Sequence, residues 1–443
     1  MGSERQPLAR LTVPVFNLIA LVKTKTEELK ILALTGLRDP ISDGVWDYCS
    51  RLASALRTHD IDIEIFEANW NKRGWLATLA TLRRSLATAR KDWVLLQYTA
   101  MGWSRRGFPF GAVAAAIAAK RSGARVGVVF HEFRGFQAMG IWARFRFVCQ
   151  GKVIRWLYLL SDVAIFTVPT ASIRWLRPDD PKACFIPIGS NIPENSAPHQ
   201  RTSSTGGPST VAVFCVTNRN RTVWEVEEIA AAIRHVVKSV PHIRLSVFGR
   251  GAIEAHHLLE KALAGSGAEI SVLGVLPAEE VNRILSDADV LLYVRDVLNP
   301  QRGSAIAAVA CGLPIAAYGD ATTSFPLSEA GAVLARPGDR NELAQALERV
   351  LTDEFFWNSL HLQSLSAYKK YFAWDEIARR FAVVLRTSHP QPPAFFPSEM
   401  TRAEEMDRVS RHAGSHPAGG NHHPQEAPML NRAGGSAELG RSR

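Results

Sequence analysis

The chain has few cysteines, and they form none of the patterns that mark a disulfide framework or a metal site. Five occur in 443 residues, with no Cys-x-x-Cys pair and no histidine partner at ligand spacing. We therefore expect small buried side chains in a reducing compartment, with no disulfide frame and no bound metal. These residues are Cys49, Cys149, Cys184, Cys215 and Cys311.

Long hydrophobic runs are also missing. The longest, near residues 153–168, is interrupted by Arg155 and Asp162, so no transmembrane helix is expected there. Residues 11–22 are apolar but too short to span a bilayer, and they lack the basic-apolar-small order of a cleavable signal. We therefore expect a cytoplasmic protein.

Several catalytic patterns are absent as well. We find no paired catalytic carboxylates at a convincing spacing, no nucleophile elbow and no zinc motif. Gly249-Arg250-Gly251 follows a predicted strand, but no third glycine or later acidic residue completes a dinucleotide-binding fingerprint. No cofactor or metal is therefore expected. The lack of a DNA- or RNA-binding motif argues against nucleic acid as a partner.

Acidic residues are scarce in one part of this chain, whose net charge is +10. Residues 83–155 contain fourteen lysines and arginines but only two acidic residues, Asp92 and Glu132. This block favours an anionic partner: a phosphorylated acceptor, an anionic membrane surface or nucleic acid. Solubility explains any single arginine equally well, but it explains the whole block less well.

The sequence is rich in short apolar runs that alternate regularly with helical segments. Such alternation predicts an α/β fold with parallel sheets covered on both faces. It restarts after a stretch rich in Ser, Thr, Gly and Pro, which predicts two doubly wound domains joined by a hinge. Strands are expected at residues 30–35, 62–67, 93–97, 125–130, 163–167, 211–216, 243–248, 270–273, 289–294 and 314–318.

The expected domain boundaries follow from this pattern. We expect an N-terminal extension at residues 1–29, a first domain at 30–194, a hinge at 195–209 and a second domain at 210–389. Residues 390–443 are rich in Pro, His, Gly, Ser and Arg, and are expected to be a disordered tail. Two such domains place the carboxyl ends of both sheets around one cleft, which suits a reaction between two bound molecules.

The segment Pro300-Gln301-Arg302-Gly303-Ser304 lies between a predicted buried strand and a predicted helix. Residues 305–310 are expected to be helical, with Ser304 as N-cap and Gly312 as the C-terminal stop. An anion site is predicted here, because the helix start offers free N–H groups, a favourable dipole and the guanidinium group of Arg302. Taken alone, the turn is equally consistent with an ordinary strand–helix connection.

Short motifs run in a fixed order through residues 30–385. They are Ser42–Tyr48, Gln97–Thr99, Arg105–Gly107, Val129–Glu132, Pro187–Pro193, Phe248–Gly251, Leu273–Pro277 and Ala310–Pro314. In order and spacing they resemble GT-B glycosyltransferases, closest to the retaining group that includes many bacterial family 4 enzymes. The resemblance implies two Rossmann-like domains facing each other across a cleft, with the nucleotide-sugar donor in the second and the acceptor in the first.

Two motifs depart from the commonest pattern of that family. Its two glutamates, eight positions apart, are replaced by Asn299 and Ala307. Asp296 with residues 301–304 instead resembles a less studied bacterial variant with an Asp-Gly…Arg-Arg-Gly-Ser signature. The usual Arg…Lys pair after the first strand of the second domain is also altered, because residues 218–221 offer arginines but no lysine.

The resemblance assigns roles to residues at the ends of predicted strands. His131 takes the place of a histidine that contacts the donor sugar, and we expect it to hydrogen-bond a hydroxyl or assist proton movement. A structural histidine that ties down a loop is the alternative. Arg302, with the N–H groups of Gly303 and Ser304, is expected to hold the donor diphosphate and stabilise the leaving group.

Further substrate-binding candidates lie in the loops near these positions. The arginines among them are candidate second cations for the diphosphate, although surface salt bridges explain them equally well. Asp296 is a candidate to bind ribose or sugar hydroxyls, although it could equally cap the following turn. The glycine allows close approach to a phosphate, as it would serve any tight turn. These candidates are Arg219, Arg221, Arg250, Asp296, Gln301 and Gly44.

We therefore predict a glycosyltransferase that transfers a hexose from a nucleotide sugar to a lipid-linked or polysaccharide acceptor, with retention implied by the resemblance. The basic first domain is expected to hold an anionic or lipid-linked glycan, with the protein peripheral at the inner face of the membrane. The rival hypothesis is a catalytically inactive GT-B-like scaffold of an envelope or polysaccharide pathway. The missing glutamates favour the scaffold, whereas the Arg-Gly-Ser turn and His131 favour the enzyme.

Overall fold

The computed structural model describes most of the chain between residues 28 and 387. The expected extension at 1–29, hinge at 195–209 and tail at 390–443 lie wholly or largely outside the described residues. The described segments are 28–37, 44–88, 91–135, 140–177, 179–192, 207–217, 221–240, 242–321 and 324–387.

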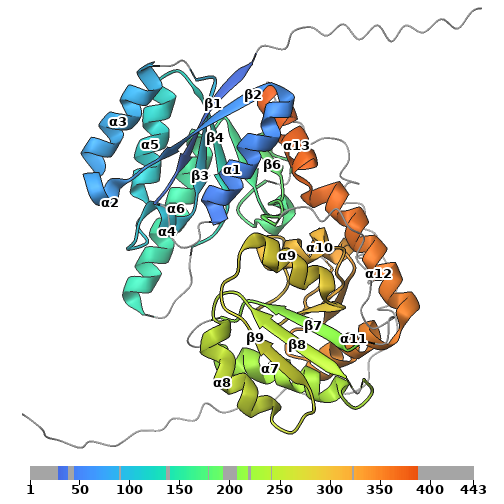
Figure 1. The fold of residues 1–443 in the computed structure, drawn as a ribbon. Coiled ribbons are helices and arrows are strands. Elements are labelled where there is room, and N and C mark those ends of the chain that lie inside the picture. Colours follow the sequence, from blue (N-terminus) through green and yellow to red (C-terminus); the bar gives the residue numbers. More distant parts are fainter. Residues whose placement is uncertain are drawn as a thin grey trace, which may run out of the picture. The chain divides into compact units, whose positions relative to one another are not determined.

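The first lobe contains a parallel sheet of six strands in the order β2-β1-β3-β4-β5-β6 (Figure 1). The strands are β1 (Leu29–Thr35), β2 (Ile61–Glu67), β3 (Trp93–Tyr98), β4 (Arg125–Phe130), β5 (Val163–Phe166) and β6 (Ala183–Phe185). Its helices are α1 (Gly44–Leu56), α2 (Trp70–Arg73), α3 (Trp75–Thr88), α4 (Ala100–Trp103), α5 (Phe110–Arg121) and α6 (Ile141–Leu160), with 3-10 turns η1 (Arg57–His59) and η2 (Thr170–Ser172).

The second lobe repeats the plan with six parallel strands in the order β12-β11-β10-β7-β8-β9. The strands are β7 (Ser209–Phe214), β8 (Ile243–Phe248), β9 (Glu269–Val272), β10 (Val290–Tyr293), β11 (Ile315–Tyr318) and β12 (Ala332–Ala335). The helices that follow β7 are α7 (Thr222–Val236), α8 (Ala252–Leu263), α9 (Ala278–Asp287), α10 (Gly303–Ala310), α11 (Arg340–Thr352), α12 (Glu354–Ala367) and α13 (Trp374–Arg386), with the 3-10 turn η4 (Leu327–Glu329) and the π-turn η5 (Tyr368–Phe372).

The expected α/β fold class is confirmed, and every expected strand is present within two residues of its predicted bounds. Two strands, β6 and β12, were not predicted. The first has only three residues, and the second reads Ala-Val-Leu-Ala, which suits a helix as well as a strand. Both lie at sheet edges, where pairing to one neighbour defines them.

Strand β1 shows why these runs are continuously apolar. Ile31 and Ala33 pack into the cluster on one face of the sheet, while Leu32 and Leu34 pack into the cluster on the other. All four side chains are almost wholly buried. Because parallel strands are covered on both faces, the hydrophobic pattern has no alternation with polar residues.

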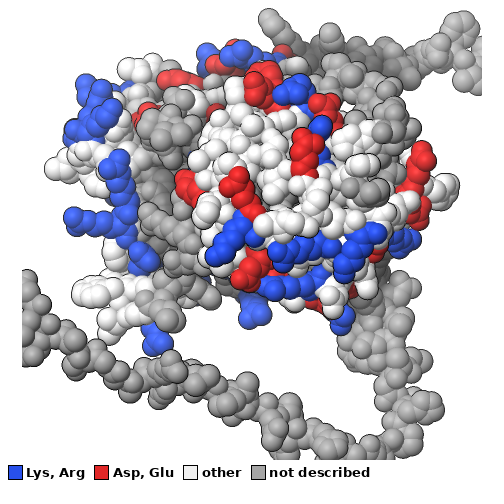
Figure 2. Space-filling view, turned by 60° about the horizontal axis from the view of Figure 1, so that its bottom comes forward, with Lys and Arg blue, Asp and Glu red and all other residues white. Residues whose placement is uncertain are grey.

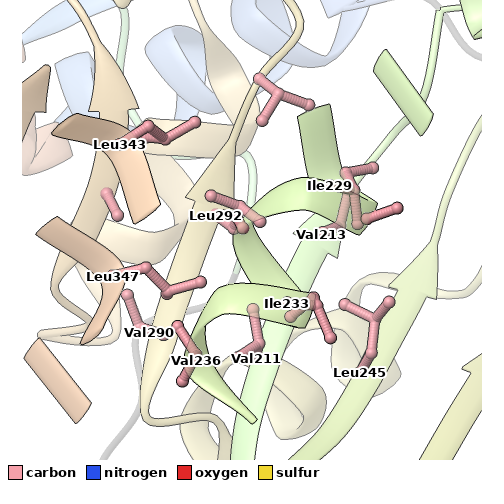
Figure 3. Close-up of a cluster of buried hydrophobic side chains, with 14 of the residues drawn as sticks. Val211, Val213, Ile229, Ile233, Val236, Leu245, Val290, Leu292, Leu343 and Leu347 are labelled. Atoms are coloured by element: carbon pink, nitrogen blue, oxygen red, sulfur yellow. The ribbon is translucent and has the colours of Figure 1, made fainter. Parts of the chain in front are cut away.

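In the second lobe, α7 and α11 cover one face of the sheet. Helix α7 contributes Ile229, Ile233 and Val236, whose spacing of three to four residues places them on one side of the helix. Figure 3 shows them packed against strand residues and against Leu343 and Leu347 of α11. The strand residues in this cluster are Val211, Val213, Leu245, Val290 and Leu292.

The last described helix, α13, packs against the first lobe. Ile377 and Phe381 are fully buried in the same cluster as Tyr48 and Leu52 of α1. The indole Nε1 of Trp93 in β3 donates a hydrogen bond to the carbonyl oxygen of Leu385 over 3.1 Å. Helices α1 and α13 therefore cover one face of the first sheet, and α3, α5 and α6 contribute to the cluster on the other.

This packing predicts a large loss of stability on Phe381→Ala. Removing a fully buried aromatic ring should lower the free energy of unfolding by about 3–5 kcal/mol, because the cavity beside α1 closes only in part. Urea unfolding followed by circular dichroism measures the change. Leu362→Ala is the control, since Leu362 is 65% exposed on α12 and should change stability by less than about 0.5 kcal/mol.

Candidate functional site

The predicted anion turn joins β10 to α10, as expected. The helix begins at Gly303, and Arg302 occupies the N-cap position with extended backbone. The expectation that Ser304 caps the helix is wrong, because the carbonyl oxygen of Arg302 already accepts from the N–H groups of Ala305 and Ile306. Gly303 and Ser304 therefore lie in the first helical turn, where N–H groups have no intrahelical acceptor. Among the described residues, no atom lies within 4 Å of where a Cβ on Gly303 would sit, so this helix start borders open space.

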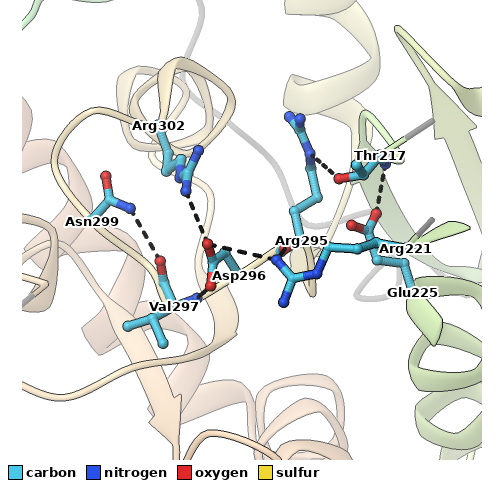
Figure 4. A network of polar contacts seen from close by, with 8 residues as sticks. All are labelled: Thr217, Arg221, Glu225, Arg295, Asp296, Val297, Asn299 and Arg302. Atoms are coloured by element: carbon cyan, nitrogen blue, oxygen red, sulfur yellow. Dashed lines mark hydrogen bonds and ion pairs between the residues drawn. The ribbon is translucent and has the colours of Figure 1, made fainter. Parts of the chain in front are cut away.

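A single carboxylate links two of the predicted arginines at this edge (Figure 4). Asp296 Oδ2 lies 3.4 Å from Arg302 Nη2 and 3.7 Å from Arg221 Nη1. Arg221 Nη1 also donates to the carbonyl oxygen of Arg295 over 3.2 Å. The other carboxylate oxygen of Asp296 accepts from the N–H of the next residue, Val297, over 2.9 Å. The structure thus brings Arg221, Asp296 and Arg302 together.

Buried polar atoms without partners gather near the same loop. Within the described part of the chain, Arg302 Nε, the Tyr293 hydroxyl and Glu225 Oε1 are buried and make no hydrogen bond. Burial raises the pKa of Tyr293 to about 12, although the nearby Arg302 and Arg295 guanidinium groups oppose the rise. A buried donor without an acceptor, such as Arg302 Nε, lowers the stability of the folded protein. An anion bound between Arg302 and the start of α10 would supply the acceptor.

Glu225 and Arg295 were missed from the sequence. Glu225 is fully buried in the first turn of α7, and its Oε2 accepts from the N–H of Thr217 over 2.7 Å. Arg295 donates from Nε to the Thr217 hydroxyl over 3.4 Å. The available signals were an acidic residue in a helix first turn and an arginine two residues after a buried strand. Neither is distinctive without the three-dimensional contacts.

The other predicted residues of this set have different settings. Arg219 lies outside the described residues. Arg250 is exposed after β8, where its carbonyl oxygen accepts from the N–H of Val216. Gly44 is exposed at the start of α1, and no contact joins it to the arginine group in the described structure.

Gln301 reaches the first lobe instead of the arginine group. Its Nε2 donates to the carbonyl oxygen of His131 over 2.6 Å and to the Thr167 hydroxyl over 2.8 Å. These two acceptors follow β4 and β5, so the α10 turn is tied to the carboxyl edge of the first sheet. Thr167 is fully buried and was not predicted.

His131 directly follows β4, and its ring is held on two sides. Its Nε2 lies 2.9 Å from Gln97 Oε1, and its ring meets Tyr48 edge-on with the centroids 5.0 Å apart. Burial lowers the pKa of His131 to about 4, so the imidazole is neutral near pH 7. The sequence analysis included Gln97 in a family motif but predicted no role for it, although a glutamine at the end of an otherwise apolar strand was a usable signal.

No metal centre accompanies this arrangement in the parts of the chain that the structure describes. No group of three or more His, Cys, Asp and Glu side chains there is arranged to hold an ion. The same described residues include no helix long and apolar enough to cross a membrane.

The low pKa of His131 predicts a specific pH dependence of stability. An unfolded chain protonates this histidine near the ordinary pKa of about 6.5, whereas the folded protein does so only near 4. Unfolding therefore takes up a proton between these values, and stability falls as the pH drops from about 6.5 to about 4. The loss attributable to His131 should reach about 3 kcal/mol, since each pKa unit corresponds to about 1.4 kcal/mol.

Comparing His131→Asn with the wild type by urea unfolding across this pH range isolates the effect. The variant should lose this part of the pH dependence, because asparagine does not titrate. His257→Asn, exposed on α8, is the control and should retain the wild-type slope. Parallel slopes for all three proteins would contradict the assignment.

The second lobe is similar to a known protein family. Residues 210–353 match the family model of glycosyl transferases group 1. Over 164 residues the chain is 30% identical to the 2-deoxystreptamine glucosyltransferase of Streptomyces kanamyceticus. That match covers 35% of this chain and 41% of the relative, so it spans about two fifths of the length of this curated protein.

Solved structures share the fold over most of the chain. HepE of Anabaena in complex with UDP has a TM-score of 0.57 at 16% identity, covering 81% of this chain and 99% of that one. A putative UDP-N-acetylglucosamine 2-epimerase from Listeria monocytogenes gives 0.54 at 14% identity, covering 81% and 96%. At such identities the likeness shows the fold alone. The family match therefore covers the second lobe, and the shared fold covers most of the chain.

Proposed function

We propose that the protein is a glycosyltransferase that holds the diphosphate of a nucleotide-sugar donor at the start of α10. The observation that carries the proposal is the position of Arg302. It stands at the N-cap of an eight-residue helix whose start borders open space, and its buried Nε has no partner among the described residues. A guanidinium fork and first-turn N–H groups are suited to bind the same phosphate oxygens.

A uridine diphosphate hexose is the donor that we propose. Anabaena HepE and Staphylococcus aureus MnaA were both solved with UDP, and they share this fold at TM-scores of 0.57 and 0.52. The curated relative, which matches 164 residues of the chain, is a glucosyltransferase. Both observations support a UDP-hexose here, and the group 1 family match supports transfer of the sugar as the reaction.

In the proposed reaction, the bond between the anomeric carbon and the diphosphate oxygen breaks. The acceptor hydroxyl oxygen forms the new glycosidic bond and gives its proton to an oxygen of the departing diphosphate. Negative charge grows on the departing diphosphate, where Arg302 and the α10 dipole stabilise it. Arg221 is the second cation, since it contacts the same carboxylate as Arg302. We propose that these protein cations serve in place of a metal ion.

His131 is proposed to orient the donor sugar. With Nε2 donating to Gln97 Oε1, the Nδ1 lone pair is left to accept a hydrogen bond from a sugar hydroxyl. The low pKa supports this role, because a neutral ring is an acceptor at physiological pH. Retention of configuration and a lipid-linked or polysaccharide acceptor complete the proposal. They rest on the motif resemblance and on the basic residues of the first lobe.

A non-catalytic scaffold is the second candidate, and two positions favour it. Ala307 is almost wholly buried in the apolar cluster around α10, so it offers no polar group to a ligand. Asn299 uses its side chain within the turn, donating to the Val297 carbonyl and accepting from the Gln301 N–H. Neither position replaces the carboxylates of the commonest family pattern.

Arg302→Ala separates the two candidates. Loss of one charge-assisted pair should weaken UDP binding about ten- to a hundredfold, equivalent to roughly 1.5–3 kcal/mol. Isothermal titration calorimetry with UDP and other nucleoside diphosphates measures the change. Arg283→Ala is the control, because Arg283 lies on α9 with an exposed side chain and should leave the affinity unchanged.

Two results would contradict the proposed site. If the wild type binds no nucleoside diphosphate at millimolar concentration, the donor site is absent and the scaffold reading stands. If UDP binds the wild type and Arg302→Ala equally well, the diphosphate lies elsewhere.

Asp296→Asn tests whether this carboxylate competes with the donor for the arginines. Removing its charge should release Arg302 and Arg221 from their shared partner and strengthen binding of free UDP by up to about fivefold. The same calorimetric titration gives the answer. Weaker binding would instead mean that the carboxylate holds a ribose hydroxyl, which is the other role predicted from the sequence.

A further inference from the structure

Helix α6 covers the first sheet with one side and leaves an apolar side uncovered. Its buried side consists of Cys149, Gln150, Val153, Ile154 and Leu157. The opposite side carries large apolar side chains that are 44–80% exposed. We call this side the α6 face; it consists of Ile141, Trp142, Phe145, Val148, Trp156 and Leu159.

Aromatic contacts join the α6 face to the segment that leads into α5. Phe145 lies against Phe108, with ring centroids 5.9 Å apart, and against Trp142 at 6.5 Å. Near the other end of α6, Trp156 lies 6.4 Å from Phe110, which is itself 45% exposed. The exposed apolar residues therefore form a cluster near each end of α6, unlike the single exposed hydrophobic residues found on most protein surfaces.

The charge along this helix has one sign. Residues 141–160 contain four basic residues and no aspartate or glutamate. Arg144, Lys152 and Arg155 are exposed and fall at helical spacing beside the apolar residues, as in Arg144–Val148 and Arg155–Leu159. In Figure 2, acidic and basic side chains are interspersed over the middle of the face that is shown.

We propose that the α6 face docks on a bilayer surface that contains anionic phospholipid. The α6 face combines exposed tryptophan and aliphatic side chains with basic residues and no acidic ones. This combination is complementary to a bilayer surface, where anionic headgroups lie above the acyl chains. Exposed basic residues would attract the headgroups, while the aromatic rings would enter the interface. A helix with one buried side lies along the surface and does not cross it. Docking here requires no donor site, so its failure would leave the proposed activity untouched.

Vesicle flotation of the full-length protein tests the proposal. Vesicles of phosphatidylcholine mixed with phosphatidylglycerol should carry the protein, and phosphatidylcholine alone should carry much less. Raising the salt from 0.1 M to 1 M should weaken binding, because the Debye length falls from about 10 Å to about 3 Å. Equal flotation with both vesicle types, or none with either, would overturn the proposal.

Variants on the exposed side test which residues are responsible. Combining Trp142→Ser with Phe145→Ser should reduce the vesicle partition coefficient about tenfold or more, since two exposed apolar groups are removed. The control is Phe355→Ser, which removes an 87% exposed ring from α12 and should leave binding unchanged. Combining Arg144→Gln with Arg155→Gln should weaken binding to anionic vesicles and flatten its salt dependence.

The same variants distinguish a protein partner from a lipid surface. Analytical ultracentrifugation of the wild type and of the Trp142→Ser, Phe145→Ser double variant reports self-association. If the double variant dissociates an oligomer while vesicle binding is unchanged, the face is a contact between copies and the lipid proposal is wrong. Loss of binding in Phe355→Ser to the same degree would also refute it, because apolar exposure in general would then be responsible.

Discussion

The packing of α13 on the first lobe is the contact on which the described architecture depends most. Six parallel strands bury side chains on both faces, so each face of that sheet needs helices. One face is covered by α1 and by α13, which comes from the far end of the chain. The buried hydrogen bond from Trp93 to Leu385 joins residues 292 positions apart, and the described residues of both lobes fall in one compact unit.

The candidate site follows from the same parallel geometry, because parallel strands bring their carboxyl ends to one edge of a sheet. His131 follows β4, Thr167 follows β5, and Arg302 stands between β10 and α10. Gln301 connects these edges through two hydrogen bonds. Gln301, the residue next to Arg302, thus donates to the carbonyl oxygen of His131. This hydrogen bond couples the position of the proposed phosphate-binding residue to that of the proposed sugar-binding residue, without an ion pair between them.

Most of the fold was predictable from the sequence, because continuous apolar runs between helical segments have few other solutions. The edge strands were not, since a strand such as β12 is defined by its neighbour more than by its own residues. Within the candidate site, Arg302 and His131 were predicted from their positions after predicted strands and from the family resemblance, and their roles stay predictions. The contacts of Gln97 and Glu225 were not predicted, because a polar side chain reveals its role only through its partner, and those partners lie 34 and 8 residues away.

The charge balance of the site bears on the replaced glutamates. With Ala307 buried in the apolar cluster and Asn299 bonded within its turn, neither position adds negative charge at the start of α10. Asp296 is the carboxylate that contacts both arginines there. Three arginines, Arg221, Arg295 and Arg302, against the two acidic residues Asp296 and Glu225 give the group a formal charge of about +1 before any ligand arrives. A diphosphate would therefore be bound by charge, and discrimination between sugars would fall to neutral groups such as His131 and Gln97.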